Sequence, residues 1–128
     1  MTRILVADDD AQVRGLTSSV LQSAGYEVDT AADGREAFSK LIHNGGYSGL
    51  VTGGEMHPGS GFELIRKIRD CGSGLPVILL TGNDSKDEEV VGVRDLVSRV
   101  VHKPYDVFEL PKIVQEYIPL KDIPLSEE

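Results

Sequence analysis

Short apolar runs alternate along the chain with longer segments in which apolar residues recur every three or four positions. The apolar runs cover residues 4–7, 50–52, 76–80 and 100–101, and residues 26–31 are also interpreted as a strand. Runs of this length, bounded by turn-forming residues, are typical of buried strands. The pattern therefore predicts five strands, each followed by a segment of helical periodicity.

The segments between these strands are expected to form helices with one apolar face. They cover residues 13–24, 37–42, 62–68, 83–97 and 106–118. Asp33 is expected to cap the second helix, because its side chain can accept hydrogen bonds from the first free backbone N–H groups.

Because of Pro111, the sequence does not show at which residue the last predicted helix begins. Asp106 and Glu109 have the spacing of a capping box, which would place Pro111 in the second turn. A proline there would clash with the carbonyl four residues earlier. Either the helix starts later, with Pro111 in its first turn, or it begins distorted.

Alternating strands and helices predict an α/β fold, with a parallel sheet covered by helices on both faces. Right-handed crossovers restrict the chain to a doubly wound sheet. Ligand sites in such folds lie at the carboxyl ends of the strands. The residues that end or follow strands should therefore converge at one edge; they are Asp8, Asp9, Gly53, Thr81 and Lys103.

An acidic cluster, a hydroxyl and a lysine at strand ends are the parts of a metal-assisted phosphoryl-transfer site. A catalytic carboxylate would be expected at the end of the third strand, where Gly53 stands. The nucleophile is therefore the missing part of the site.

Composition limits the remaining possibilities. The 128 residues fit one domain, which we place at residues 1–118; residues 119–128 are expected to be a tail or the start of a linker. The net charge of −8 argues against direct contact with nucleic acid. No apolar stretch is long enough to span a membrane, and the single Cys71 cannot form an internal disulfide, so a cytoplasmic location is expected.

Six segments carry a resemblance to a known family when they are taken together, in order and at compatible spacing. They are residues 4–10, 32–37, 47–52, 61–69, 76–82 and 103–106. Over residues 1 to about 118 the chain resembles the receiver domain of bacterial two-component response regulators. The resemblance implies a flavodoxin-like sheet with strand order 2-1-3-4-5 and a role in phosphorelay signal transduction.

In that family an aspartate at the end of the third strand accepts a phosphoryl group from a histidine kinase. The resemblance implies that Asp8 and Asp9 are the acidic pair that holds Mg²⁺, with Asp9 the more direct ligand. It also implies that Thr81 and Lys103 contact the phosphoryl oxygens, and that the Lys103–Pro104 peptide bond is cis.

The third strand departs from the family pattern at the acceptor position. The residues that align on either side are Tyr47, Thr52, Met56 and Gly61, and they place Gly53 where the family has its aspartate. Anchoring on Pro58 would place Gly54 there instead. Neither glycine has a side chain to phosphorylate. Val100 is a second departure, since it stands where the family often has an aromatic residue.

We interpret the chain as a degenerate receiver that is not phosphorylated on aspartate, is not an enzyme and requires no cofactor. Mg²⁺ binding at Asp8 and Asp9 is expected to be weak, because the site has lost one anion. Lys103 is expected to form an ion pair with this acidic pair instead. Glu55 is a poor substitute acceptor, because the loop geometry would point it away from the pocket.

Such a module would act by binding a protein, namely a histidine kinase, an output domain or a second copy of itself in a homodimer. The receiver surface used for this consists of the fourth helix, fifth strand and fifth helix. Its candidate residues here are Val90, Val93, Arg94, Val97, Arg99 and Pro111.

Two alternatives remain open at this point. The chain could be a conventional phosphoacceptor receiver in which Gly53 is a loss-of-function variant, although Val100 counts against this. A remote alternative is a Mg²⁺-dependent phosphatase, because Asp8 and Asp10 have the spacing seen in haloacid-dehalogenase-type enzymes. Gln12 does not fit that pattern, and Asp10 could simply cap a helix.

Overall fold

The structure is a computed structural model that describes residues 2–120. Its centre is a parallel sheet of five strands in the order β2-β1-β3-β4-β5. The strands are β1 (Arg3–Ala7), β2 (Glu27–Ala31), β3 (Gly49–Gly53), β4 (Val77–Thr81) and β5 (Arg99–His102). Both the five strands and the expected order are confirmed.

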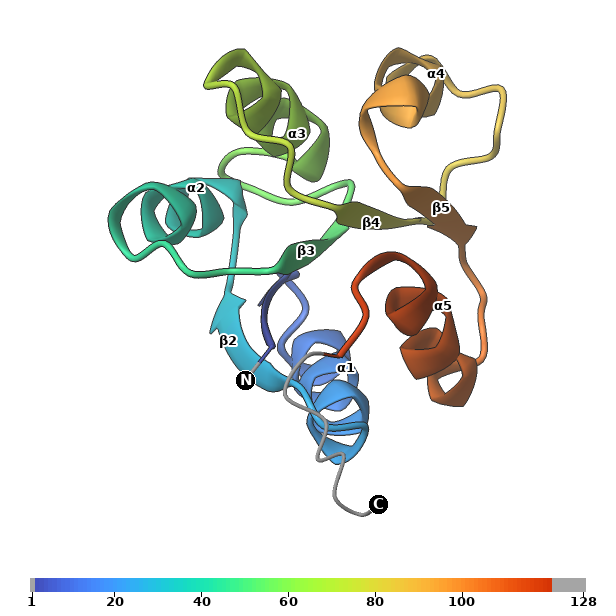
Figure 1. Cartoon of the computed structure of the whole chain (residues 1–128). Coiled ribbons are helices and arrows are strands. Elements are labelled where there is room, and N and C mark those ends of the chain that lie inside the picture. The colour runs from blue at the N-terminus through green and yellow to red at the C-terminus, as the bar shows by residue number, and fades with distance from the viewer. Residues whose placement is uncertain (1, 121–128) are drawn as a thin grey trace.

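Helices cover both faces of this sheet (Figure 1). One face carries α1 (Ala11–Ser23) and α5 (Leu110–Tyr117), and the other carries α2 (Gly34–His43), α3 (Gly61–Asp70) and α4 (Glu88–Val93). Two short 3₁₀ segments, η1 (Arg94–Leu96) and η2 (Val107–Glu109), precede β5 and α5. The doubly wound architecture predicted from the alternating pattern is therefore present.

The two faces of the sheet bury separate apolar clusters, because successive strand residues point to opposite sides. Ile4 and Val6 of β1 pack with residues of α1 and α5, whereas Leu5 and Ala7 pack with residues of α2, α3 and α4. All five residues of β4 are buried. This fixes the strand ends in a rigid frame and leaves the loops at those ends available for function.

Side-chain caps fix where several helices begin. Asp33 Oδ1 accepts a hydrogen bond from Glu36 N at 2.9 Å, which confirms the predicted cap of α2. Asp10 Oδ1 accepts from Gln12 N and Val13 N at 2.9 and 3.2 Å. Asp10 therefore acts as the cap of α1, the simpler of the two roles considered for it.

The fourth helix is shorter than predicted. Instead of residues 83–97, α4 covers only Glu88–Val93, and η1 follows it. Before the helix, the backbone N–H groups of Asn83 and Lys86 are taken by the side chains of Thr81 and Asp84, and Asp87 then caps α4 by accepting from Glu89 N. Such local hydrogen bonds before the helix compete with helix formation, which explains why the helix begins at Glu88 rather than at residue 83.

The last helix starts later than Asp106, which is the first of the two options considered. Asp106 Oδ1 accepts from Phe108 N at 2.9 Å, and this caps the 3₁₀ turn η2. α5 then begins at Leu110, with Pro111 in its first turn. A proline there loses no helical hydrogen bond.

Two residues predicted on an exposed interaction surface lie in the core instead. Val90 and Val93 are 1% and 0% exposed, because they are spaced three residues apart on the side of α4 that faces α3 and the sheet. Val91 lies between them and is 48% exposed. Among the other predicted surface residues, Arg94 and Arg99 are exposed, and Val97 and Pro111 are partly buried.

Within residues 2–120, no helix is long and apolar enough to cross a membrane. Of the expected tail at 119–128, residues 121–128 lie outside the described part of the chain. Leu120 packs against the cluster beneath α1 and α5.

Tyr26 ties the start of β2 to the end of α5. Its hydroxyl donates a hydrogen bond to Ile118 O across 92 residues of sequence, and the residue is 3% exposed. Burial raises the pKa of Tyr26 from 10 to about 12. The folded state therefore holds this proton at a pH where the unfolded chain would lose it.

Tyr26→Phe is expected to lower the free energy of unfolding by about 1 kcal/mol at neutral pH, because Ile118 O loses its donor. A raised pKa stabilises the fold fully below pH 10, and that contribution is lost as the pH rises through about 12. Urea unfolding measured from pH 7 to 11.5 should show a steeper alkaline loss in the parent chain than in the variant. Equal alkaline losses would contradict this assignment.

Candidate functional site

Strand register brings the predicted site residues to one edge of the sheet. Ala7 lies opposite Thr52 in the β1–β3 pair, so the next residues, Asp8 and Gly53, are neighbours. On the other side of β3, Thr81 lies opposite His102, and Lys103 N donates to Thr81 O at 2.8 Å. The convergence predicted at the carboxyl ends of the strands is therefore observed.

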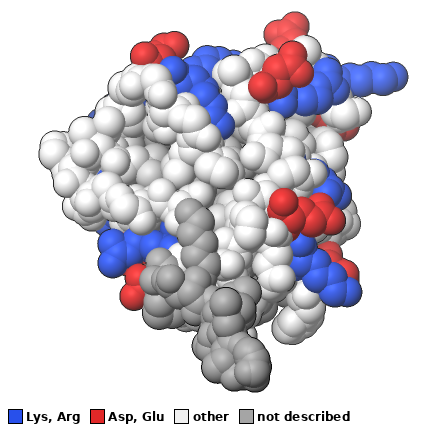
Figure 2. All heavy atoms as spheres, in the orientation of Figure 1, with Lys and Arg blue, Asp and Glu red and all other residues white. Residues whose placement is uncertain are grey.

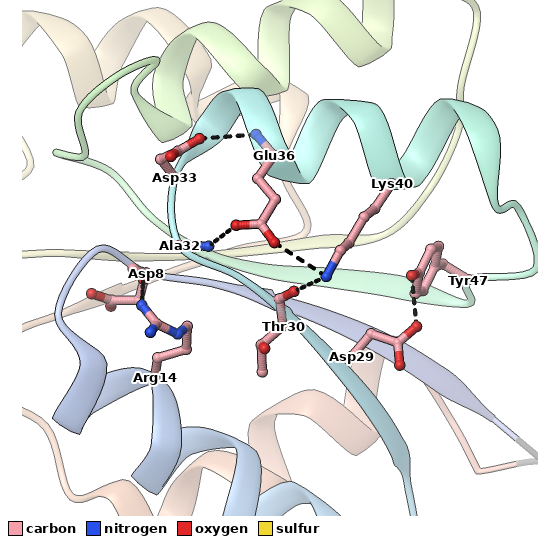
Figure 3. A network of polar contacts seen from close by, with 9 residues as sticks. All are labelled: Asp8, Arg14, Asp29, Thr30, Ala32, Asp33, Glu36, Lys40 and Tyr47. Atoms are coloured by element: carbon pink, nitrogen blue, oxygen red, sulfur yellow. Dashed lines mark hydrogen bonds and ion pairs between the residues drawn. The ribbon is translucent and has the colours of Figure 1, made fainter.

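Asp8 is the buried member of the acidic pair, with 5% of its surface exposed. Its Oδ1 accepts a hydrogen bond from Asp10 N at 2.9 Å. Its backbone carbonyl accepts one from Arg14 Nη1 at 2.7 Å, with the carboxylate pointing away from the guanidinium (Figure 3). The second carboxylate oxygen, Oδ2, is buried and has no hydrogen-bond partner.

Gly53 faces this unpartnered oxygen. A Cβ added at Gly53 would lie 3.4 Å from Asp8 Oδ2, which is an ordinary contact distance. A Cβ added at Gly54 would instead lie 2.5 Å from Phe62 Cζ, in the core beneath α3. A side chain at position 53 would therefore point toward Asp8, whereas one at position 54 would point into the core.

Thr81 and Lys103 lie on the other side of the site. Thr81 is fully buried, and its Oγ1 accepts a hydrogen bond from Asn83 N at 3.0 Å. Lys103 is exposed, and the Lys103–Pro104 peptide bond is cis, as the resemblance implied.

The ion pair expected between Lys103 and the acidic pair is absent from residues 2–120, so that prediction is wrong. Asp8 presents Oδ1 to the turn and buries Oδ2, whereas the ammonium of Lys103 is exposed. An exposed ammonium keeps its hydration and gains little from a surface pair.

The acidic pair fits a hard cation only in part. Asp8 Oδ2 is an unsatisfied acceptor and Asp9 is exposed, so both could bind Mg²⁺. Mg²⁺ prefers six oxygen ligands. The described part of the chain offers no group of three or more His, Cys, Asp or Glu residues placed to hold a metal. When bound, Mg²⁺ would neutralise charge on phosphoryl oxygens at this edge.

Tyr105, two residues beyond Lys103, lies near enough to Asp8 for its pKa to be affected by the charge of that carboxylate. Burial raises the pKa of Tyr105, and the negative charge of Asp8 raises it further, against a hydrogen bond with Thr17 that lowers it. The pocket beside Tyr105 is apolar, about 410 Å³ in volume, and lies between α1 and the loop after β5.

Other candidates from the sequence lie away from the pocket or serve the fold. Glu55 is exposed, and Val100 packs against the core near α4. His102 Nδ1 contacts Asn83 O at 2.8 Å, so this histidine holds the loop after β4.

Two supporting interactions were not evident from the sequence. Arg14 reaches back from the first turns of α1 to Asp8 O, and a basic residue so soon after three aspartates was the only signal for it. Behind β2, Glu36 accepts from Ala32 N at 2.8 Å and pairs with Lys40 at 3.3 Å (Figure 3). The hydrogen bond from Ala32 lowers the pKa of Glu36, and Lys40 adds to this.

Comparison with known proteins gives the same picture. The sequence model of the response regulator receiver domain matches residues 4–115. The response regulator MprA of Mycolicibacterium vanbaalenii is 38% identical over 108 residues, covering 84% of this chain and 46% of that protein. The alkaline phosphatase synthesis transcriptional regulatory protein SphR of Synechococcus elongatus is 32% identical over 117 residues, with 85% and 46% covered. The chain thus spans about half the length of these relatives.

Solved structures with the same fold include the chemotaxis protein CheY4 of Vibrio cholerae, with a TM-score of 0.82 and 31% identity. The response regulator TrrA of Thermotoga maritima, solved in complex with Mg²⁺ and BeF, has a TM-score of 0.78 and 34% identity. Each comparison covers 91% of this chain and 98% of the other. The chain belongs to the response regulator receiver domain family and is a receiver module of two-component signal transduction.

Proposed function

We propose that this receiver module is not phosphorylated on aspartate and acts through protein–protein contacts, without enzymatic activity of its own. The proposal rests on one observation. A side chain at position 53 would point toward Asp8, since an added Cβ would lie 3.4 Å from Asp8 Oδ2, but Gly53 has no side chain. Covalent phosphoryl transfer needs a nucleophile at that point. Glycine supplies none, and the exposed Glu55 is the nearest acidic residue along the chain.

No cofactor is required for this role, and Mg²⁺ binding is proposed to be weak. TrrA, which has the same fold, was solved with Mg²⁺ and BeF, and this chain carries Asp8, Asp9, Thr81 and Lys103 at the carboxyl edge of its sheet. Two carboxylates in place of three reduce the affinity for a hard cation that needs several oxygen ligands.

The proposed docking surface is the face formed by α4, β5 and α5. Its exposed residues include Val91, Arg94 and Arg99, and Arg99 pairs with Glu116 of α5 at 3.6 Å. On the side shown in Figure 2, basic and acidic side chains are interspersed and form no broad basic area. A histidine kinase, an output domain or a second copy of the chain is therefore favoured over nucleic acid as the partner.

A second candidate is a conventional acceptor receiver in which Gly53 is a loss-of-function variant. The ordinary contact distance at Gly53 favours it, because a Cβ there would not require Asp8 to move. Restoring the side chain therefore distinguishes the two candidates.

Incubation with acetyl phosphate and Mg²⁺ should leave the intact mass of the parent chain unchanged. Gly53→Asp should gain one phosphoryl group, because its carboxylate would enter the pocket beside Asp8. Gly53→Asn is the matched control, since it has the same shape and cannot form the acyl phosphate. Intact-mass and peptide mass spectrometry would check all three proteins.

Stoichiometric phosphorylation of the parent chain on any carboxylate would overturn the proposal. A large change in the oligomeric state of Gly53→Asp on phosphorylation would favour the second candidate, because it would mean that the switching machinery is intact. An unchanged oligomeric state would support a degenerate receiver.

Alanine substitutions at the two glycines should have opposite effects on stability. Gly54→Ala should lower the free energy of unfolding by about 1–3 kcal/mol, because its Cβ would lie 2.5 Å from Phe62 Cζ. Gly53→Ala should leave it unchanged or raise it by up to about 1 kcal/mol, since the backbone there suits other residues. Urea unfolding of both variants would check this, and a greater loss in Gly53→Ala would contradict the assigned side-chain directions.

A further inference from the structure

We propose that the chain associates with a second copy of itself through the apolar pocket between α1 and the loop after β5, with Phe108 of each copy seated in the pocket of the other. This pocket belongs to α1 and the loop after β5, not to the face formed by α4, β5 and α5. The inference therefore does not depend on that face, nor on whether position 53 can accept a phosphoryl group.

The pocket is the receiving half of this contact. Its volume is about 410 Å³, and Leu16 of α1 and Pro104 and Tyr105 of the following loop are among the residues that line it. An apolar cavity of about 150 Å³ is enough to hold benzene. The pocket can therefore accommodate the ring of a phenylalanine together with the atoms that accompany it.

Phe108 is the inserting half. Within residues 2–120 it is the most exposed of the large apolar side chains, at 73%, and Leu16 in the pocket wall is 49% exposed. Single exposed apolar residues are ordinary on a protein surface. Here two of them lie at one site beside a hollow. Aromatic side chains bury about 150–250 Å² each and are enriched in the cores of interfaces.

The backbone around Phe108 holds its ring outside the turn. Asp106 Oδ1 accepts a hydrogen bond from Phe108 N at 2.9 Å, which caps η2. Val107 lines the pocket and Leu110 is buried, so the residues on either side of Phe108 face the body of the molecule. A side chain whose backbone is already fixed loses less conformational freedom on association.

The adjacency of ring and pocket along the chain favours a second copy as the occupant. Val107 lines the pocket, and Phe108 follows it directly. In a two-fold dimer the same patch of both copies meets, so that each contact occurs twice. One symmetric contact therefore seats both phenylalanine rings at once and closes the dimer.

Charges around the patch complement one another in the same arrangement. Lys103 lines the pocket, and its ammonium forms no ion pair within residues 2–120. Glu109 follows Phe108 and pairs with Lys112 of its own copy at 3.4 Å, through side chains that are 55% and 78% exposed. Such an exposed pair contributes little and is readily exchanged. Glu109 beside the inserted ring can then pair with Lys103 at the edge of the other copy's pocket.

Analytical ultracentrifugation of the whole chain would test this association. The dimer should be weak, with a Kd of about 10 μM to 1 mM, since interfaces smaller than about 1,200 Å² are typical of transient complexes. Phe108→Ala should raise the Kd about tenfold or more, because a central aromatic residue is truncated. Ile42→Ala and Val91→Ala are matched controls, since each shortens a half-exposed apolar side chain elsewhere, and both should behave like the parent. Circular dichroism would check that all variants are folded.

Charge reversal tests how the two copies are arranged. Lys103→Glu and Glu109→Lys should each weaken the dimer several-fold, because like charges would then face each other across the contact. The double variant, which carries both changes, should recover most of the parent affinity. Exposed apolar surface that merely sticks together would not show this recovery.

A fluorescent residue reports the position of the ring itself. The chain contains no tryptophan, so Phe108→Trp introduces a single one. Its emission should move to shorter wavelength as the protein concentration rises through the Kd, because the ring leaves water. Val91→Trp should show no such change.

A parent chain that stays monomeric up to about 1 mM would overturn the inference. So would a dimer that Val91→Ala weakens as much as Phe108→Ala does, because the contact would then lie on the face that includes α4. A double charge variant no tighter than the single ones would also overturn it. Failure of the proposed function is a separate result, since it would appear as a covalent mass gain of the parent chain with acetyl phosphate.

Discussion

The contact between the ends of β1 and β3 is the constraint on which the site depends. Parallel register places Ala7 opposite Thr52, so Asp8 and Gly53 must be neighbours. Asp8 is held there by a bond from Asp10 N to its carboxylate and one from Arg14 to its carbonyl. Its unpartnered Oδ2 lies beside Gly53, 3.4 Å from where a Cβ would be. A buried carboxylate beside a residue without a side chain leaves the pocket incomplete.

The rest of the fold holds this contact in place. Apolar clusters on both faces of the sheet fix the strands, and the core position of Phe62 leaves no room for a side chain at Gly54. The loops after β4 and β5 carry Thr81 and Lys103 to the same edge. Asp8, Thr81 and Lys103 thus come to the edge of the sheet at which Gly53 offers no carboxylate, which is why we propose binding rather than chemistry.

Much of this followed from the sequence, because apolar runs separated by helical periodicity leave few topologies for a parallel sheet. The strand order and the cis Lys103–Pro104 bond came from the family resemblance. Other features depend on three-dimensional detail. The phase of a helix as short as α4 could not be read from its sequence, so Val90 and Val93 were wrongly placed on the surface. The predicted ion pair between Lys103 and the acidic pair was wrong, because it depended on how far each charged group is buried and hydrated. The spacing of residues in the sequence does not give that information.

We propose that the space beside Asp8 contains no carboxylate able to accept a phosphoryl group. A crystal structure of the unmodified chain grown with Mg²⁺ and beryllofluoride tests it most directly, because beryllofluoride bonds to an acceptor carboxylate in place of the phosphoryl group. We expect that no carboxylate oxygen of the chain is bonded to beryllium and that no side chain enters the space beside Gly53. Beryllofluoride bonded to Glu55, or to any other carboxylate brought into the pocket, would contradict it.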